Sequence, residues 1–101
     1  MKTIEQSERE TARWIVLSAL YHGAGIPVAE RLVLSVLEAV PIKATASDVR
    51  THLHFLESAG MAHVKRLPDG GWVAEITKAG MDVVEYTADC PAGIARPVKY
   101  W

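Results

Sequence analysis

The sequence predicts an α+β fold with three helices, a two-stranded β-hairpin, a short C-terminal helix and an extended tail. Apolar residues recur at helical spacing in three segments before residue 60. Two short segments of alternating character, 61–66 and 72–76, flank a Pro-Asp-Gly-Gly turn at 68–71. Prolines and a glycine, without helical or strand periodicity, then occupy residues 88–101. We therefore expect one domain over residues 1–87 and an extended, proline-containing tail over 88–101, either packed across the domain or free.

The first helix is expected over residues 7–22, because Ser7 is a favourable N-cap and Gly23 and Gly25 follow the last apolar residue. Helical spacing places one apolar face toward the core, formed by Ala12, Ile15, Val16, Ala19 and Leu20. A second apolar face adjoins the first and is formed by Trp14, Leu17 and Tyr21. The apolar surface of this helix is thus wider than one stripe.

The second helix is expected to begin near Pro27, because the first turn of a helix tolerates a residue without an amide hydrogen. Pro41 ends it. Its predicted buried side consists of Val28, Leu32, Val33, Val36, Leu37 and Val40.

The third helix is expected over residues 46–59, with Thr45 or Ser47 as its N-cap. Its core face is predicted to be Val49, Leu53 and Leu56, and Gly60 follows where a left-handed residue often ends a helix. After the hairpin, Thr77 is the expected cap of a last helix over residues 78–86, with Met81 and Val84 facing inward.

These spacings resemble a known class of regulators. The pattern runs Val49-x3-Leu53-x2-Leu56-x3-Gly60, then Val64, a glycine-rich turn and Ile76-Thr77-x2-Gly80. It resembles the winged helix-turn-helix of MarR-, ArsR- and PadR-like bacterial regulators over about residues 26–86. The ending with Gly-Ile-x-Arg-Pro is similar to small winged-helix proteins of Mu-like prophages. The resemblance implies a winged helix, with residues 47–59 as recognition helix, the turn at 68–71 as wing, and double-stranded DNA as partner of a bacterial or phage regulator of transcription.

The residues expected to contact DNA lie on the third helix and before the hairpin turn: Ser47, Arg50, Thr51, His54, Lys65 and Arg66. Arg50 is the expected guanine reader, because its planar fork matches two acceptors on that base. Lys65 and Arg66 are expected to bind phosphates. The alternatives are a solvated helix face and charges that protect an edge strand from aggregation.

Two features oppose DNA binding and favour the alternative function, a winged-helix module that binds protein. The net charge is −1 and the pI is near 6.4, whereas many DNA-binding modules are basic. Arg50 is the only arginine or lysine of the third helix and is accompanied by Asp48 and Glu57. A continuous positive stripe over this helix and the hairpin would favour DNA, and an apolar patch there would favour protein.

A homodimer is also expected, because small domains seldom expose much aromatic surface. The expected interface comprises Trp14, Leu17, Tyr21, Tyr100 and Trp101. The alternative is that these residues cover the sheet or the tail within one chain. In the tail, Arg96 and Lys99 are open to three interpretations: a DNA-contacting arm, a docking motif or a strap over the core.

No catalytic or cofactor chemistry is predicted. His52 and His54 point about 200° apart on a helix and cannot share a metal ion, and one of them is expected to be partly buried. Cys90 lacks the partners of a catalytic thiol, and as the only cysteine it cannot form an internal disulfide. We therefore expect a cytoplasmic protein with no enzymatic activity, no cofactor and no metal. Charges interrupt the most apolar segment, so no membrane span is expected.

Overall fold

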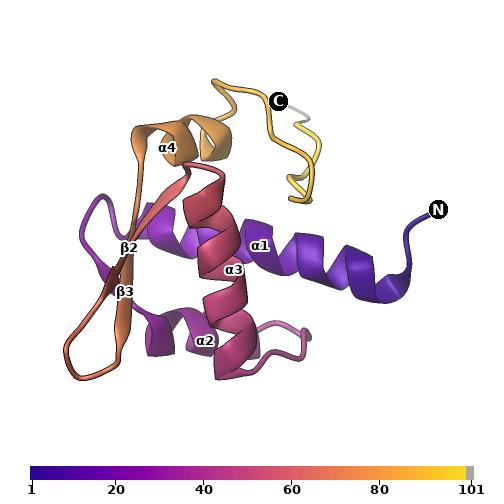
Figure 1. Cartoon of the computed structure of the whole chain (residues 1–101). Coiled ribbons are helices and arrows are strands. Elements are labelled where there is room, and N and C mark those ends of the chain that lie inside the picture. Colours follow the sequence, from indigo (N-terminus) through magenta and orange to yellow (C-terminus); the bar gives the residue numbers. More distant parts are fainter. Residues whose placement is uncertain (100–101) are drawn as a thin grey trace.

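The structure, a computed structural model, describes residues 1–99 of the 101-residue chain. The elements in this part of the chain are α1 (Ile4–His22), β1 (Val28–Ala29), α2 (Glu30–Glu38), α3 (Ala46–Ser58), β2 (Ala62–Arg66), β3 (Trp72–Ile76) and α4 (Lys78–Val84). The predicted α+β class is confirmed. The order of the elements is consistent with a winged-helix-like layout, in which α3 lies beside a long β-hairpin (Figure 1).

The three strands form one antiparallel sheet in the order β1-β3-β2. The predicted β2–β3 hairpin is confirmed, and its register runs from Ala62 opposite Ile76 to Arg66 opposite Trp72. The short strand β1 was not predicted. It pairs with β3 through Val28 opposite Ala74, so the segment before α2 extends the sheet.

The start predicted for the first helix was wrong. Thr3 is the N-cap of α1, because its side chain accepts a hydrogen bond from the Gln6 amide. The Ser7 amide then donates to the Thr3 carbonyl, so Ser7 lies inside the first turn. The Thr45 cap of α3 is confirmed and forms a capping box with Asp48.

The start and the buried face predicted for the second helix were also wrong in part. Pairing with β3 holds Val28 and Ala29 in extended conformation, so α2 begins at Glu30 rather than near Pro27. The core receives Val33 and Leu37, whereas Leu32 and Val36 are 56% and 41% exposed. Neighbouring helical positions are turned by about 100°, so a nine-residue helix that packs on one stripe leaves the adjoining stripe exposed.

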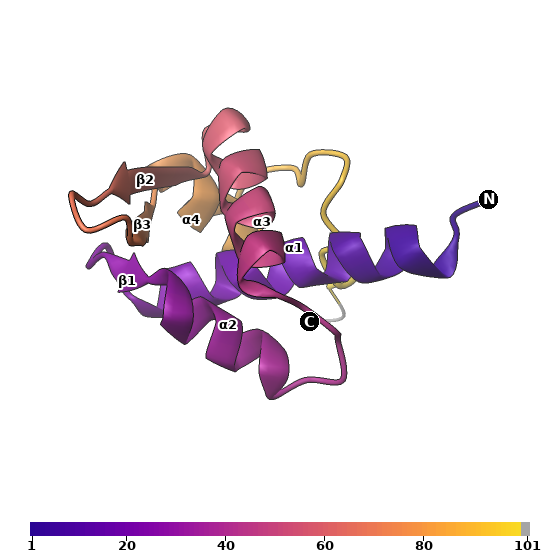
Figure 2. The same ribbon diagram turned by 60° about the horizontal axis from the view of Figure 1, so that its bottom comes forward.

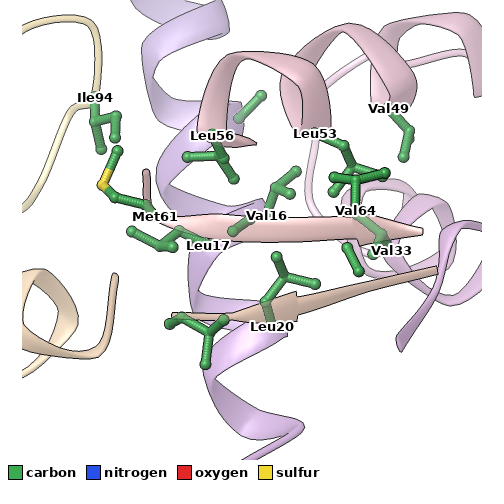
Figure 3. Packing of buried hydrophobic residues seen from close by; sticks show 14 of the residues in the cluster. Val16, Leu17, Leu20, Val33, Val49, Leu53, Leu56, Met61, Val64 and Ile94 are labelled. Carbon is green, nitrogen blue, oxygen red and sulfur yellow. The ribbon is translucent and has the colours of Figure 1, made fainter. Parts of the chain in front are cut away.

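The core lies between the three long helices and the inner face of the sheet (Figure 3). The predicted core face of α3 is confirmed, because Val49, Leu53 and Leu56 are all buried. The last helix ends at Val84 rather than at residue 86, where Tyr86 has left the helical conformation with a φ of 62°. Val83 is the buried residue of that turn, and Met81 and Val84 pack against the core while partly exposed.

The described part of the tail, residues 88–99, packs on the domain without forming a helix or strand (Figures 1 and 2). Ile94 is buried in the core, and the Ala95 amide donates to the Glu10 carbonyl at 3.1 Å. Arg96 donates to the carbonyls of Val83 and Ala88 at 2.9 and 2.8 Å. Of the alternatives left open by the sequence, the tail is a strap over α1 and α4 rather than a free arm.

Candidate functional site

The residues predicted to contact DNA lie on α3 and on the adjacent hairpin, and we call this region the α3–hairpin face. It comprises Ser47, Arg50, Thr51, His54, Lys65 and Arg66, together with the neighbouring Glu30, Glu57 and Trp72. Ser47, Thr51 and His54 are exposed on α3, as is Lys65 on β2. The structure therefore brings the predicted residues to one side of the molecule, with α3 and the hairpin side by side (Figure 2).

Arg50, the predicted guanine reader, is held by an acidic residue of another helix. Its Nε and Nη2 atoms donate to the two carboxylate oxygens of Glu30 at 2.7 and 2.8 Å, and Nη2 also donates to the Gly70 carbonyl at 2.6 Å. Glu30 additionally accepts the Trp72 amide at 2.7 Å. The hydrogen bonds from Arg50 lower the pKa of Glu30, which keeps that carboxylate ionised. Arg50 thus joins α2, α3 and the hairpin turn through a bidentate ion pair.

Arg66 is paired in the same way, within the α3–hairpin face. Its Nη1 and Nη2 atoms donate to the two oxygens of Glu57 at 3.2 and 3.1 Å. This pairing lowers the pKa of the Glu57 carboxyl. His54 lies near the same carboxylate, with 3.6 Å between Nδ1 and Oε1. Both arginines assigned to DNA contact are therefore neutralised by carboxylates of the same chain.

Trp72 is the central residue of this face, and the sequence interpretation did not include it. The guanidinium carbons of Arg50 and Arg66 lie 4.7 and 4.4 Å from its ring centroid, within cation–π range. Arg66 and Trp72 are opposite each other in the hairpin register. That cross-strand position follows from the turn at 68–71, so the Arg66–Trp72 contact was available from the sequence.

The charge that remains on this face is small. Among residues 1–99, Lys65 forms no ion pair with an acid. Asp48 and Asp69 are exposed near the start of α3 and the hairpin turn. The face therefore lacks the continuous positive stripe that would favour DNA.

A groove of about 850 Å³ opens between α2, the start of α3 and the hairpin. Its apolar walls are formed by Ala29, Leu34, Val49, Leu67, Trp72 and Val73. Arg31, Ser47 and Asp69 belong to its polar lining, and the Glu30–Arg50 pair lies within it. We call it the α2–hairpin groove. Only part of its apolar lining, Val49 of α3 and Leu67, Trp72 and Val73 of the hairpin, lies where the sequence analysis associated an apolar patch with a protein partner.

The structure describes three of the five residues predicted for the dimer interface, and one of them is buried within the chain. Leu17 is 0% exposed in the core of one chain, so its assignment to an interface was wrong. Trp14 packs edge-on against Tyr86 at 6.4 Å, and the Tyr21 hydroxyl donates to Glu85 at 2.7 Å. Tyr100 and Trp101 lie outside the described residues. The exposed apolar residues of this side are instead Leu32 and Val36, which line a hollow between α1 and α2.

The two histidines of α3 are separated as predicted: His54 is exposed, and His52 is 5% exposed against the core. Within residues 1–99, no group of three or more His, Cys, Asp and Glu side chains is arranged to hold a metal ion. Burial raises the pKa of the Cys90 thiol. None of the helices described combines the length and the apolar composition needed to cross a membrane.

No protein-family model matches this sequence, and no curated protein matches it. Function is therefore inferred from the geometry of the chain itself.

Proposed function

We propose that the chain is a winged-helix module that binds a protein partner through the α2–hairpin groove and the adjoining α3–hairpin face. The observation that carries the proposal is the pairing of Arg50 with Glu30 and of Arg66 with Glu57. A surface that binds duplex DNA gains most of its affinity by neutralising phosphates with free cations. Here each arginine already has a carboxylate, and binding phosphate would require breaking that ion pair.

The groove offers what a protein partner requires. Its lining is mainly apolar, and it includes an aromatic side chain and an arginine, two residue types enriched where protein interfaces are most stable. Arg31 and Asp69 provide one charge of each sign at its polar lining. The partner segment that fits this chemistry is a short peptide or helix with two or three apolar side chains flanked by both an acidic and a basic residue.

Selection from a random peptide library tests this proposal while the partner is still unidentified. The selection is made on the native protein, and the selected peptides are measured against Leu67→Glu, which places a charge in the groove wall. Leu32→Glu is the matched control, because Leu32 is an exposed leucine outside the groove. We expect apolar peptides that bind the native protein and L32E and lose at least tenfold in affinity for L67E. Peptides that bind all three proteins equally would refute the groove as the docking site.

A second function, binding of double-stranded DNA, is favoured by the element order and by the exposed Ser47, Thr51, His54 and Lys65. In this mechanism α3 enters the major groove, and Lys65 contacts a flanking phosphate. Arg50 and Arg66 would exchange Glu30 and Glu57 for the nucleic acid. Fluorescence anisotropy with a duplex distinguishes the two functions, because DNA binding requires an affinity that decreases with salt and is lost in an Arg50/Lys65/Arg66 triple alanine variant.

A further inference from the structure

A second hollow lies between the first turns of α1 and the tail. These turns are at the end of α1 that lies away from β1 (Figure 2). The hollow has a volume of about 650 Å³. The side chains that line it from α1 and from the segment before that helix are polar: Lys2, Gln6, Arg9, Glu10 and Arg13. Residues 90–94 of the tail form the other wall. We call it the α1–tail pocket.

The pocket holds more positive than negative charge. Among residues 1–99, three cations line it, whereas Glu10 is its only acidic residue. The Glu10 carboxylate is already occupied, because it forms an ion pair with Lys2 and accepts from the Gln6 amide group. Neither Arg9 nor Arg13 has a carboxylate within ion-pair distance among residues 1–99.

Arg9 and Arg13 are one helical turn apart and face the same hollow. Arg13 is fixed in place: Nη1 donates to the Gly93 carbonyl at 3.0 Å, and its guanidinium carbon lies 4.0 Å from the Phe55 ring centroid. Its Nη2 atom makes no hydrogen bond within the described chain, and Arg9 makes none with its side chain. Two like charges at this spacing destabilise a helix unless a counter-charge compensates them.

The pKa shifts of Arg13 and His52 are consistent with an excess of positive charge in this pocket. The pKa of Arg13 is lowered by burial and by the charge of Arg9. The pKa of His52, which is buried on α3 with an unpartnered Nδ1, is lowered by burial and then by Arg13. Glu10 partly offsets the positive charge at Arg13, and Asp48 partly offsets it at His52. Within residues 1–99, however, neither carboxylate forms an ion pair with Arg9 or Arg13.

We propose that the α1–tail pocket binds a phosphate-class oxyanion between the guanidinium groups of Arg9 and Arg13, with Lys2 at its edge. The planar fork of arginine matches two oxygens of such an anion through parallel, charge-assisted hydrogen bonds. A doubly charged anion would neutralise both arginines, which a single carboxylate does not achieve. The proposal is independent of the groove, because it involves none of the residues of α2 or the hairpin.

The test is a titration of the ¹⁵N-labelled protein with inorganic phosphate, compared with chloride at the same ionic strength. We expect saturable shifts confined to the Arg9 and Arg13 side chains and to the backbone amides of residues 92–94. Arg9→Gln should weaken phosphate binding about tenfold, since it removes charge-assisted hydrogen bonds while leaving the partners of Arg13 in place. Lys43→Gln is the matched control, because it removes an exposed cation that lines neither the pocket nor the groove and should leave the phosphate affinity unchanged.

The proposal is overturned if the shifts do not saturate, if chloride produces the same shifts, or if R9Q and K43Q have equal effects. O-phosphoserine separates the two sources of the ligand. Binding at least as tight as that of inorganic phosphate indicates a site for a phosphate carried on a larger molecule, and exclusion of phosphoserine indicates a site for the free ion.

Discussion

Two regions of the molecule each hold two arginines, and the regions differ in what lies beside the guanidinium groups. On the α3–hairpin face, Arg50 and Arg66 each form a bidentate pair with a carboxylate. In the α1–tail pocket, Arg9 and Arg13 have no carboxylate partner within residues 1–99. The face with the expected DNA-binding residues is thus nearly neutral, whereas uncompensated positive charge lies elsewhere. Element order alone does not indicate which surface attracts an anion.

The largest effect on stability is expected at Gly93, a tail residue that lines the α1–tail pocket and whose carbonyl accepts from Arg13. It has a φ of 95°, and a Cβ at this position would lie 2.8 Å from Phe55 Cζ. We expect Gly93→Ala to lower the free energy of unfolding by about 2–4 kcal/mol, because the strained backbone and the steric conflict add. Chemical denaturation measures this loss.

Gly25→Ala is the matched control for Gly93→Ala. Gly25 has a φ of 85°, but a Cβ at this position would meet nothing within 4 Å, so only the backbone strain is introduced. We expect a loss of about 1 kcal/mol. Equal losses in the two variants would show that the tail does not pack on Phe55 as described.

Removing the Glu30 side chain should have the next largest effect on the free energy of unfolding. Glu30→Ala leaves the Trp72 amide without its acceptor and Arg50 without its carboxylate. We expect the free energy of unfolding to fall by about 1–3 kcal/mol, measured by chemical denaturation. Glu38→Ala, an exposed position of the same helix, should change stability by less than about 0.5 kcal/mol. A loss at Glu30 no larger than at Glu38 would contradict the role assigned to the pair.

Acid should lower the free energy of unfolding, because His52 is buried beside Arg13. Burial and Arg13 lower the pKa of His52 in the folded state below its ordinary value of 6.5, so the unfolded chain binds the proton more readily. Stability should therefore decrease as the pH falls below about 6.5, by at most about 1.4 kcal/mol per pH unit for one group. The decrease should end below the folded-state pKa of His52.

His52→Gln should remove this decrease between pH 6.5 and the range where carboxylates titrate, when denaturation is measured across pH. His63→Gln, at an exposed position of β2, should retain it. If the native protein and H52Q follow the same pH profile in this window, His52 does not titrate as inferred.

Glu57→Gln should have the smallest effect on stability, below about 1 kcal/mol, because exposed ion pairs contribute little. Arg66 retains Trp72 as a packing partner in this variant. The consequence for ligands is different: E57Q gives Arg66 an uncompensated charge and should raise the affinity for polyanions such as heparin. An unchanged elution salt on heparin resin, relative to the native protein, would count against the neutralisation of Arg66 by Glu57.

Local signals in the sequence predicted much of the fold. The spacing of Val49, Leu53 and Leu56, the cap at Thr45 and the turn at 68–71 each depend on residues close together in the chain, and all are confirmed. The strand β1 could not be predicted from local signals, because a two-residue strand has no periodicity. Its partner residues on β3 are also far away in the sequence.

The charge available on the α3–hairpin face and in the α1–tail pocket was harder to predict, because it also depends on contacts between residues far apart in the sequence. Side-chain types indicated which residues face solvent on α3, but not which charges are available to a ligand. The partner of Arg50 is 20 residues away in the chain, and the carbonyl that accepts from Arg13 is 80 residues away. Such pairings depend on how α2 and the tail pack, and they decide whether an arginine is neutralised or left to bind an anion.

The central claim, that Glu30 and Glu57 keep the α3–hairpin face from binding DNA, is tested most directly by duplex anisotropy across a salt series. The native protein is compared with a Glu30→Gln/Glu57→Gln variant, after circular dichroism has shown that both are folded. We expect no saturable binding by the native protein at physiological salt. The variant should bind, with a salt dependence that corresponds to about two phosphate contacts or more. Saturable, salt-dependent binding by the native protein that is lost in the Arg50/Lys65/Arg66 triple alanine variant would contradict the claim and establish this face as a DNA-binding surface.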